Sequence, residues 1–516
     1  MRAGGPQPPP CLEPPAARPG PARTHRRGAQ PPRCALARPP GHRRRGPHCP
    51  ERSRRTGTQP ARAPGRTRPV PGLTPRPPAP GGPPGDHRPR PLGTKPRHPC
   101  PARRNRRSGT AHRRPPVTDT ATTRTAPDTV PENPELLIED APADTAADTA
   151  RLLDLTSALR SEAPRILGFP GNLAFDFSDL GPALAVLTNN VGDPTSGDAS
   201  GVHTKAYEQA VVRFLTQTAG ARPDDVYGYV TTGGTEGILF GLATARRYLP
   251  HAHVYASDQA HYSVAKAAGL LGLRLVTLPS NDDGTLDPES LKLASFFHRR
   301  VNPHRGRGPG AIVVATIGTT MRGAYDDVTE LRKWATAAGD VYVHADAASG
   351  GPIAAHAPSA PRWNFTHGAD SISISGHKII GAPVPCGVVL ARKNLIDEPV
   401  IASEYTKASA RTLGCSRSGL AALLLWSALR RLGHSGLRAH ILRCLETAQY
   451  AVDQLTRAGV RPTRTTDSLT VCFDRPAAWV VRKWHLACEG STAHLITVGH
   501  VTRTTIDDLC RDLRTP

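Results

Sequence analysis

A lysine and an aspartate end two apolar stretches of this chain, each of which predicts a buried strand. Lys378 closes SISISGHK, where Ser and Ile alternate, and Asp346 ends VYVHAD, after which small residues follow. A buried acid needs a cationic partner, and a lysine in apolar surroundings has the lowered pKa of a nucleophilic amine. Pyridoxal phosphate (PLP) requires this pair, because its aldehyde bonds to a lysine and its pyridine nitrogen pairs with an acid. The alternative for Asp346 is the N-cap of a helix.

Further segments supply the other groups that a PLP site needs. TGGTE links a predicted strand to a predicted helix, and its glycines let the free N–H groups of a helix N-terminus approach a phosphate. His261 follows another strand; its imidazole can stack on a pyridine ring, although a lone histidine is more often structural. Ser375 and His377 precede the lysine and can hydrogen-bond a phosphate. The remaining candidates are Gly234 and Thr235 in TGGTE, Ala348 below the ring, and Thr319 and Thr320 at a further strand end.

Strands and helices alternate from about residue 180, which predicts an α/β domain with a mainly parallel sheet. Ligands bind such sheets at the carboxyl ends of the strands, where the candidate residues fall. The predicted strands are 226–231, 253–256, 274–278, 311–317, 341–345, 371–375 and 387–391. The predicted helices are 205–218, 236–248, 262–271 and 328–338.

The pattern changes after Leu395. Apolar helices at 420–432 and 437–455, short strands at 469–473 and 494–498, and a last helix at 505–513 predict a smaller α+β domain. The resulting division is a disordered tail over 1–116, a flexible linker over 117–150, an N-terminal helical segment over 151–188, a large PLP-binding domain over 189–395 and a small domain over 396–516.

The 516-residue chain carries a formal charge of +23, which by itself suggests a nucleic-acid-binding protein. The excess is confined to residues 1–116, which hold 27 of the 66 Lys and Arg residues, 3 of the 43 Asp and Glu residues, and 31 of the 54 prolines. Such a composition predicts a disordered tail. A basic tail can bind nucleic acid, but the near-neutral remainder holds no binding motif, so we expect no nucleic-acid partner. A further hypothesis is that translation starts at Val117 and the tail is not made.

The ten cysteines show no CxxC and no paired spacing. This pattern argues against a disulfide framework or a metal site such as zinc, and it is typical of a protein of the reducing cytoplasm. No apolar run approaches the ~18 residues of a membrane span, so we expect no membrane association.

Five segments together resemble the group II PLP-dependent amino-acid decarboxylases. They are YVTTGGTEGILFG, AHYSVAKAAGLLG, ATIGTTMRGAYDDV, VHADAASGG and SISISGHKIIGAPVPCGVVLARK. The similarity runs from about Asn189 to the C-terminus, and the chain looks most like the bacterial histidine decarboxylases and the related plant serine decarboxylases. The resemblance implies a PLP-dependent transferase fold of type I and a homodimer with its active site at the subunit interface.

The same resemblance assigns roles to single residues. It implies that Lys378 is the Schiff-base lysine, that Asp346 pairs with the pyridine nitrogen, and that His261 stacks on the ring and contacts the substrate. The residues that it implies on the phosphate side are Thr235, Ser375 and His377.

Tyr405, in SEYTKAS, matches the place of a family tyrosine and is the candidate proton donor; the alternative is a tyrosine at the rim of the site. TSGDASGVH lacks the aromatic residues that relatives carry and offers His203 as a substrate contact. GCSRSG stands where the family has SGSRNG, and Ser-Gly-Gly follows the Asp-Ala-Ala. We predict decarboxylation of an L-amino acid, with histidine as the leading substrate. Valine, leucine or serine is the alternative, and a PLP enzyme of another reaction type is a third hypothesis.

Overall fold

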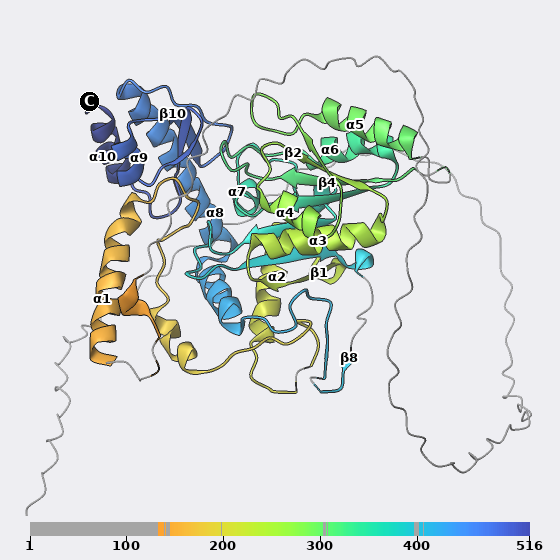
Figure 1. Cartoon of the computed structure of the whole chain (residues 1–516), viewed down its shortest axis with the longest axis horizontal. Coiled ribbons are helices and arrows are strands. Elements are labelled where there is room, and N and C mark those ends of the chain that lie inside the picture. The colour runs from red at the N-terminus through yellow and green to blue at the C-terminus, as the bar shows by residue number, and fades with distance from the viewer. Residues whose placement is uncertain are drawn as a thin grey trace, which may run out of the picture. The chain divides into compact units, whose positions relative to one another are not determined.

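The computed structural model describes residues 133–515, apart from 139, 141–144, 198, 303–305, 307, 397–401 and 406. The predicted tail over 1–116 and most of the predicted linker over 117–150 lie outside the described residues. The described residues all belong to one compact unit, 127–516. Within it, Figure 1 shows a layered α/β body and a smaller cluster of helices and strands near the C-terminus.

Seven strands form the central sheet: β1 (Val226–Thr231), β2 (His253–Ser257), β3 (Leu275–Leu278), β4 (Ala311–Thr316), β5 (Val341–Asp346), β6 (Ser371–Ser375) and β7 (Gly387–Arg392). Their order in the sheet is β1-β7-β6-β5-β4-β2-β3. The pairs from β3 to β6 are parallel, whereas β7 is antiparallel to both of its neighbours, β1 and β6. The connection from Gly376 to Cys386 contains no helix that could carry the chain across the sheet, so β7 returns antiparallel. The prediction of a mainly parallel sheet is confirmed.

Helices cover both faces of this sheet (Figure 1). They are α2 (Lys205–Thr218), α3 (Gly234–Tyr248), α4 (Ser263–Leu270), α5 (Pro288–Val301), α6 (Val328–Ala335), the short α7 (Gly351–Ala354) and α8 (Gly419–Arg457). Ile312 and Val314 of β4 pack with α3 and α4, while Val313 and Ala315 pack in the core that includes α2, α5, α6 and α8. Because both of its faces are buried, β4 is apolar from Ala311 to Ala315.

The C-terminal region forms a smaller α+β unit. It contains the strands β10 (Thr470–Asp474), β11 (Ala487–Glu489) and β12 (Thr492–Ile496) and the helices α9 (Ala478–Lys483) and α10 (Arg503–Leu513). Its three strands are antiparallel, in the order β10-β12-β11. Thr497 Oγ1 donates a hydrogen bond to the Cys444 carbonyl of α8 at 3.0 Å, so the second half of α8 belongs with this unit.

The two helices predicted at 420–432 and 437–455 are one element, α8, with a kink. Gly433 interrupts it with φ 59° and ψ −177°, a conformation that favours glycine. Before the kink, Leu425 is fully buried beneath the turn that follows β6. One long helix therefore joins the large sheet to the C-terminal unit.

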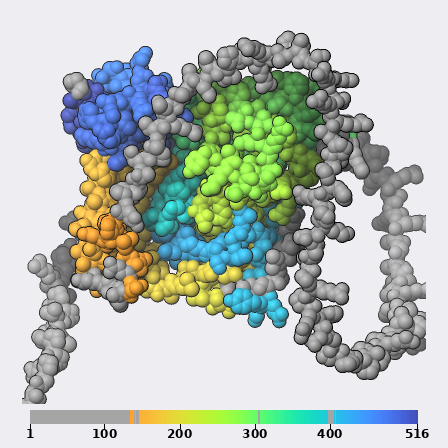
Figure 2. Space-filling view, viewed as in Figure 1, coloured from red at the N-terminus to blue at the C-terminus, as the bar shows by residue number. Residues whose placement is uncertain are grey.

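Before the large sheet, α1 (Thr145–Glu162) begins earlier than the predicted helical segment at 151, and none of its residues is buried. Figure 2 shows it in orange at the surface, below the blue C-terminal residues. The segment after α1 is tied to the C-terminal unit, because the Leu167 N–H donates to the Trp484 carbonyl at 3.2 Å and the Ile496 N–H donates to the Leu167 carbonyl at 2.7 Å. Backbone hydrogen bonds thus hold the segment after α1 against the C-terminal unit.

The short elements are η1 (Pro134–Leu136), η2 (Ala163–Arg165), η3 (Ser178–Ala185), η4 (Pro223–Asp225), η5 (Thr336–Ala338), η6 (Phe365–His367), η7 (Lys393–Leu395), β8 (Ala402–Ser403) and β9 (Ala408–Ser409). Among the described helices, none is long and apolar enough to cross a bilayer. The described part of the chain holds no group of three or more His, Cys, Asp or Glu side chains suited to a metal ion, and its six cysteines are free.

Candidate active site

A cavity of about 370 Å³ opens where the central strands end. It gathers side chains from the segments that follow β1, β2, β4, β5 and β6. The predicted site residues in its wall are Gly234, Thr235, His261, Thr320, Asp346, Ala348, Ser375, His377 and Lys378. A larger cavity of about 980 Å³ lies between the sheet domain and the C-terminal unit, but none of these candidates lines it.

Asp346 ends β5 and is 5% exposed. Its Oδ1 accepts a hydrogen bond from the Ala348 N–H at 3.2 Å and a weaker one from Ser373 Oγ at 3.5 Å. Among the described residues, none donates to its Oδ2. Burial raises the pKa of the Asp346 carboxyl, and the charge of Lys378 opposes that rise. A further cation at Oδ2 would stabilise the carboxylate form.

Lys378 lies in the turn after β6. Burial lowers the pKa of its amine, and the charge of Asp346 opposes this effect. The lowered pKa leaves more of the amine neutral at pH 7, which is the nucleophilic form. The turn is fixed by its backbone, because the Lys378 carbonyl accepts hydrogen bonds from the N–H groups of Asn172 at 3.2 Å and Gly381 at 3.0 Å.

Two histidines in the cavity wall are also partly buried. The Nδ1 atom of His261 lies 2.6 Å from Ser263 Oγ, and burial lowers the pKa of its imidazole. Burial likewise lowers the pKa of His377, whose Nδ1 lies 2.9 Å from the Cys386 carbonyl. Both rings are therefore mainly neutral at pH 7, so they can stack or hydrogen-bond without carrying a charge.

The N-terminus of α3 forms one wall of the cavity. A Cβ atom on Gly234 would lie 3.0 Å from Ser375 Oγ and 3.3 Å from Ala348 Cβ, so this position has little room for a side chain. Glu236 Oε2 accepts hydrogen bonds from the backbone N–H and the hydroxyl of Thr232, both at 2.8 Å, which fixes the turn that leads into the helix. The first N–H groups of a helix of 15 residues lack intrahelical partners and favour an anion.

These groups fit PLP. The cavity offers one acid with an uncommitted oxygen, one amine of lowered pKa and one helix N-terminus, which are complementary to the ring nitrogen, the aldehyde and the phosphate of the cofactor.

One predicted lining residue is corrected by the structure. Thr319 is buried away from the cavity, where its Oγ1 accepts a hydrogen bond from the Ala324 N–H at 3.0 Å, and only its neighbour Thr320 lines the wall. Thr316 also lines the cavity and was not predicted. It pairs with Asp346 in the parallel register of β4 and β5, so strand alignment was the signal that could have found it.

The structure does not bring His203 or Tyr405 to the cavity. His203 is exposed in the segment before α2. Tyr405 is 91% exposed in the turn between β8 and β9. The roles that the resemblance implies for these two residues remain predictions.

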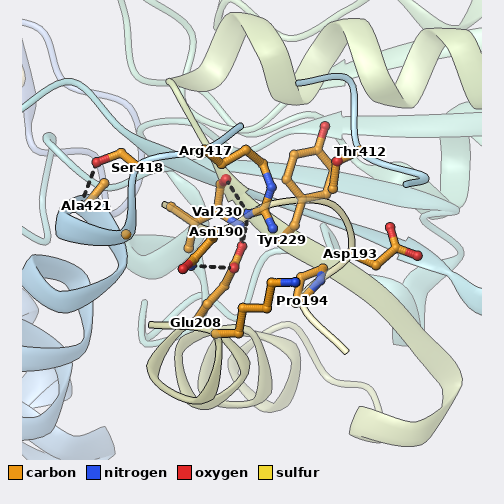
Figure 3. Close-up of polar contacts among 12 residues, drawn as sticks. Asn190, Asp193, Pro194, Glu208, Tyr229, Val230, Thr412, Arg417, Ser418 and Ala421 are labelled. Atoms are coloured by element: carbon orange, nitrogen blue, oxygen red, sulfur yellow. Dashed lines mark hydrogen bonds and ion pairs between the residues drawn. The ribbon is translucent and has the colours of Figure 1, made fainter. Parts of the chain in front are cut away.

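A buried ion pair that the sequence did not predict lies behind β1 (Figure 3). Arg417 pairs with Glu208 of α2, and the side chains are 4% and 0% exposed. Glu208 also accepts hydrogen bonds from the Val230 N–H and from Asn190 Nδ2, each at 2.8 Å, while Arg417 Nη2 donates to the Gly192 carbonyl at 2.7 Å. The pair thus ties α2, β1 and the segment before α8 together.

Comparisons with known proteins indicate the same cofactor. The model of the pyridoxal-dependent decarboxylase conserved domain matches residues 243–473. A histidine decarboxylase of Vibrio campbellii is 35% identical over 67% of this chain and 90% of its own length. A histidine decarboxylase of Morganella morganii is 37% identical over 67% of this chain and 91% of its own length.

Solved structures show the same fold. L-methionine decarboxylase from Streptomyces sp. 590 superposes with a TM-score of 0.67 at 22% identity, over 75% of this chain and 98% of that one. A sphingosine-1-phosphate lyase of Burkholderia pseudomallei superposes with a TM-score of 0.58 at 19% identity, over 77% and 96%. The sheet with its cavity is thus the type I fold of PLP enzymes. With a fitting cofactor cavity and relatives matched over nine-tenths of their length, the chain belongs to the group II pyridoxal-dependent decarboxylases and is a PLP-dependent carboxy-lyase.

Proposed function

We propose that this enzyme converts L-histidine to histamine and CO2. The observation that supports histidine is the identity of 35% and 37% to two histidine decarboxylases, over 90% and 91% of their length. Closely related carboxy-lyases share their cofactor chemistry and differ in the side-chain pocket, so the substrate is the finer part of this proposal.

We propose that different cavity residues bind different parts of PLP. Lys378 would hold the cofactor through its neutral amine, and Oδ2 of Asp346 would accept a hydrogen bond from the protonated ring nitrogen. His261 would stack on the ring and contact the substrate carboxylate, and the small Ala348 would leave room for the ring. The groups proposed for the phosphate are Gly234, Thr235, Ser375 and His377.

When bound, PLP supplies an electron sink for the bond that breaks between the α-carbon and the carboxylate. The protein would have to fix the orientation of the substrate carboxylate, exclude water, and deliver a proton to the α-carbon. We propose that His261 orients the carboxylate and that Tyr405 delivers the proton. His203 is proposed to contact the substrate side chain.

We further propose that the enzyme is a homodimer in the cytoplasm. Leu152, Leu153 and Leu159 of α1 are 61–65% exposed, and exposed apolar side chains gathered on one helix often mark a protein–protein interface. The exposure of Tyr405 is consistent with a residue that becomes covered only when a second copy binds.

The six free cysteines of the described residues are consistent with a reducing compartment. The division into a large domain over 189–395 and a small one over 396–516 is part of the same proposal.

The test is a substrate panel with the PLP-loaded full chain. We would measure CO2 and amine release from histidine, valine, leucine, serine and methionine, supplied one at a time. Histamine as the main product supports the proposal. Release from another amino acid with none from histidine would contradict the substrate while leaving the reaction type intact.

A further inference from the structure

The alternation of Ser and Ile in β6 gives the strand one polar buried face. Ile372 and Ile374 pack into the core on the side of α8, whereas Ser371, Ser373 and Ser375 are 0–2% exposed and lie on the side of α3. Burying hydroxyl groups is unfavourable unless they are hydrogen-bonded. This serine face therefore needs partners within the protein.

The helix α3 approaches this face closely because it carries glycine at matching positions. A Cβ atom on Gly237 would lie 2.7 Å from Ser373 Cβ, and one on Gly241 would clash with the ring of His344. His344 lies on β5, two residues before Asp346, and its register partner on β6 is Ser371. The helix thus covers the polar side chains of β5 and β6 and excludes solvent from them.

The polar groups of this layer form a chain that ends at Asp346. Ser371 Oγ lies 2.8 Å from His344 Nδ1, His344 Nε2 lies 3.3 Å from Ser373 Oγ, and Ser373 Oγ lies 3.5 Å from Asp346 Oδ1. Complete burial lowers the pKa of His344 to about 3, so its ring is neutral and has one donor and one acceptor nitrogen.

Only one direction of donation suits a carboxylate at the end of this chain. If the Ser371 hydroxyl donates to Nδ1, then Nε2–H donates to Ser373 and the Ser373 hydroxyl is free to donate to Asp346. In the other direction, the Ser373 hydroxyl donates to Nε2 and presents only an oxygen to the carboxylate, which is repulsive. A carboxylate at Asp346 therefore selects the first direction. In that direction the Ser373 hydroxyl donates to Asp346, and this hydrogen bond in turn favours the carboxylate form over the protonated acid.

We propose that Ser373 and His344, supported by Ser371, are positioning residues that hold Oδ1 of Asp346 as a hydrogen-bond acceptor and so leave Oδ2 for the protonated ring nitrogen of the cofactor. This inference rests on the proposed role of Asp346. It adds to the machinery of the reaction three residues that do not line the cavity.

The test is Ser373→Ala in the PLP-loaded enzyme, read by the 15N NMR shift of ring-labelled PLP. This substitution removes one buried hydroxyl and leaves the backbone unchanged. We expect the wild-type nitrogen to be protonated at pH 7 and the variant signal to move toward that of the unprotonated ring. We also expect kcat to fall about tenfold with KM changed less than about twofold, the size of one hydrogen bond to a charged group.

Ser295→Ala is the matched control, because Ser295 is a fully buried serine of α5 that does not line the cavity. We expect it to leave both the ring-nitrogen signal and kcat unchanged. A Ser373→Ala enzyme with the wild-type signal and wild-type kcat would overturn the proposal. Equal changes in both variants would assign the effect to buried serines in general and would overturn it as well.

Variants of His344 give an independent measurement if Ser373→Ala does not fold. His344→Gln keeps an amide donor near the place of Nε2, and we expect it to retain most of the protonated signal. His344→Leu has neither donor nor acceptor, and we expect it to shift the signal as Ser373→Ala does. Equal signals from the two variants would contradict the proposed role of His344. The NMR signal needs no substrate. An inactive wild-type enzyme would therefore contradict the proposed function, while the signals of the variants would still test the roles of Ser373 and His344.

Discussion

Asp346 ends a strand of the central sheet and His261 and Lys378 follow two others, whereas His203 and Tyr405 lie on loops. Parallel strands end at the same edge, so three residues far apart in sequence meet in one cavity. The loops have no such constraint, and both of their side chains are exposed outside that cavity. The contrast indicates that sheet topology brings the strand-end residues into one cavity, whereas nothing comparable fixes the positions of the two loop residues.

Lys378→Ala tests the residues at the strand ends, and we expect it to have the largest effect on turnover of all the variants. The variant loses the only amine proposed to bond to PLP, so we expect turnover to fall at least about a thousandfold. The visible absorbance of the bound cofactor should also change. Lys266→Ala removes an exposed lysine of α4 and should leave both readings as in the wild type. An active Lys378→Ala enzyme would contradict the assignment.

Glu208→Gln tests the buried pair that joins the loop segments to the sheet. Because Arg417 would keep its charge without a partner, we expect the free energy of unfolding to fall by about 3–5 kcal/mol. Urea unfolding of the two proteins measures this difference. Asp474→Asn breaks an exposed pair with Arg461, whose side chains are 68% and 87% exposed, and should cost less than about 1 kcal/mol. Similar losses from both variants would refute the distinction.

Tyr405→Phe and His203→Ala test the proposed roles of the two loop residues. We expect Tyr405→Phe to lower kcat about a hundredfold, as for loss of a general acid, with PLP still bound. His203→Ala should instead raise KM for histidine about tenfold with little change in kcat. If steady-state kinetics show both variants to be unchanged, these loops take no part in the reaction.

The buried histidine behind the cavity predicts a pH dependence of stability. The pKa of His344 is lowered to about 3, while an unfolded histidine titrates near 6.5, so the unfolded chain binds more protons between these values. Stability should therefore rise with pH across this window and be lost as the pH falls, by up to about 1.4 kcal/mol per pH unit. In the cofactor-free protein, His344→Gln should show a slope smaller by that amount in urea unfolding measured from pH 6 to pH 4. An unchanged slope would mean that His344 is charged when folded.

The sequence predicted the regular elements well because their signals are local. α2, β1 and β6 have the predicted bounds, because α2 has apolar residues at helical spacing, β1 is a short run of mainly apolar residues and β6 alternates Ser with Ile. α5 is absent from the prediction although Asp287 caps it and Pro288 begins it, which are local start signals. The short β11 and α9 have too few residues to show a period.

Contacts between residues far apart in the sequence could not be predicted from the sequence. Glu208 and Arg417 are 209 residues apart, and no spacing rule links them. The place of Thr316 depends on the register of β4 against β5, and that of Thr319 on a turn that directs its hydroxyl inward. The motifs around Lys378 and Asp346 were found because each stands at the end of a strand that could itself be predicted.

The glycines that let α3 approach the serine face have a consequence for how the protein folds. Gly237 and Gly241 lie in the helix interior, where each glycine costs about 1 kcal/mol relative to alanine. On its own, α3 is therefore a weak helix, and its order depends on the sheet already being in place. The anion site at its N-terminus would then arise late, after the chain has passed its folding barrier. Refolding rates should accordingly be independent of PLP concentration, whereas unfolding should slow as PLP is added.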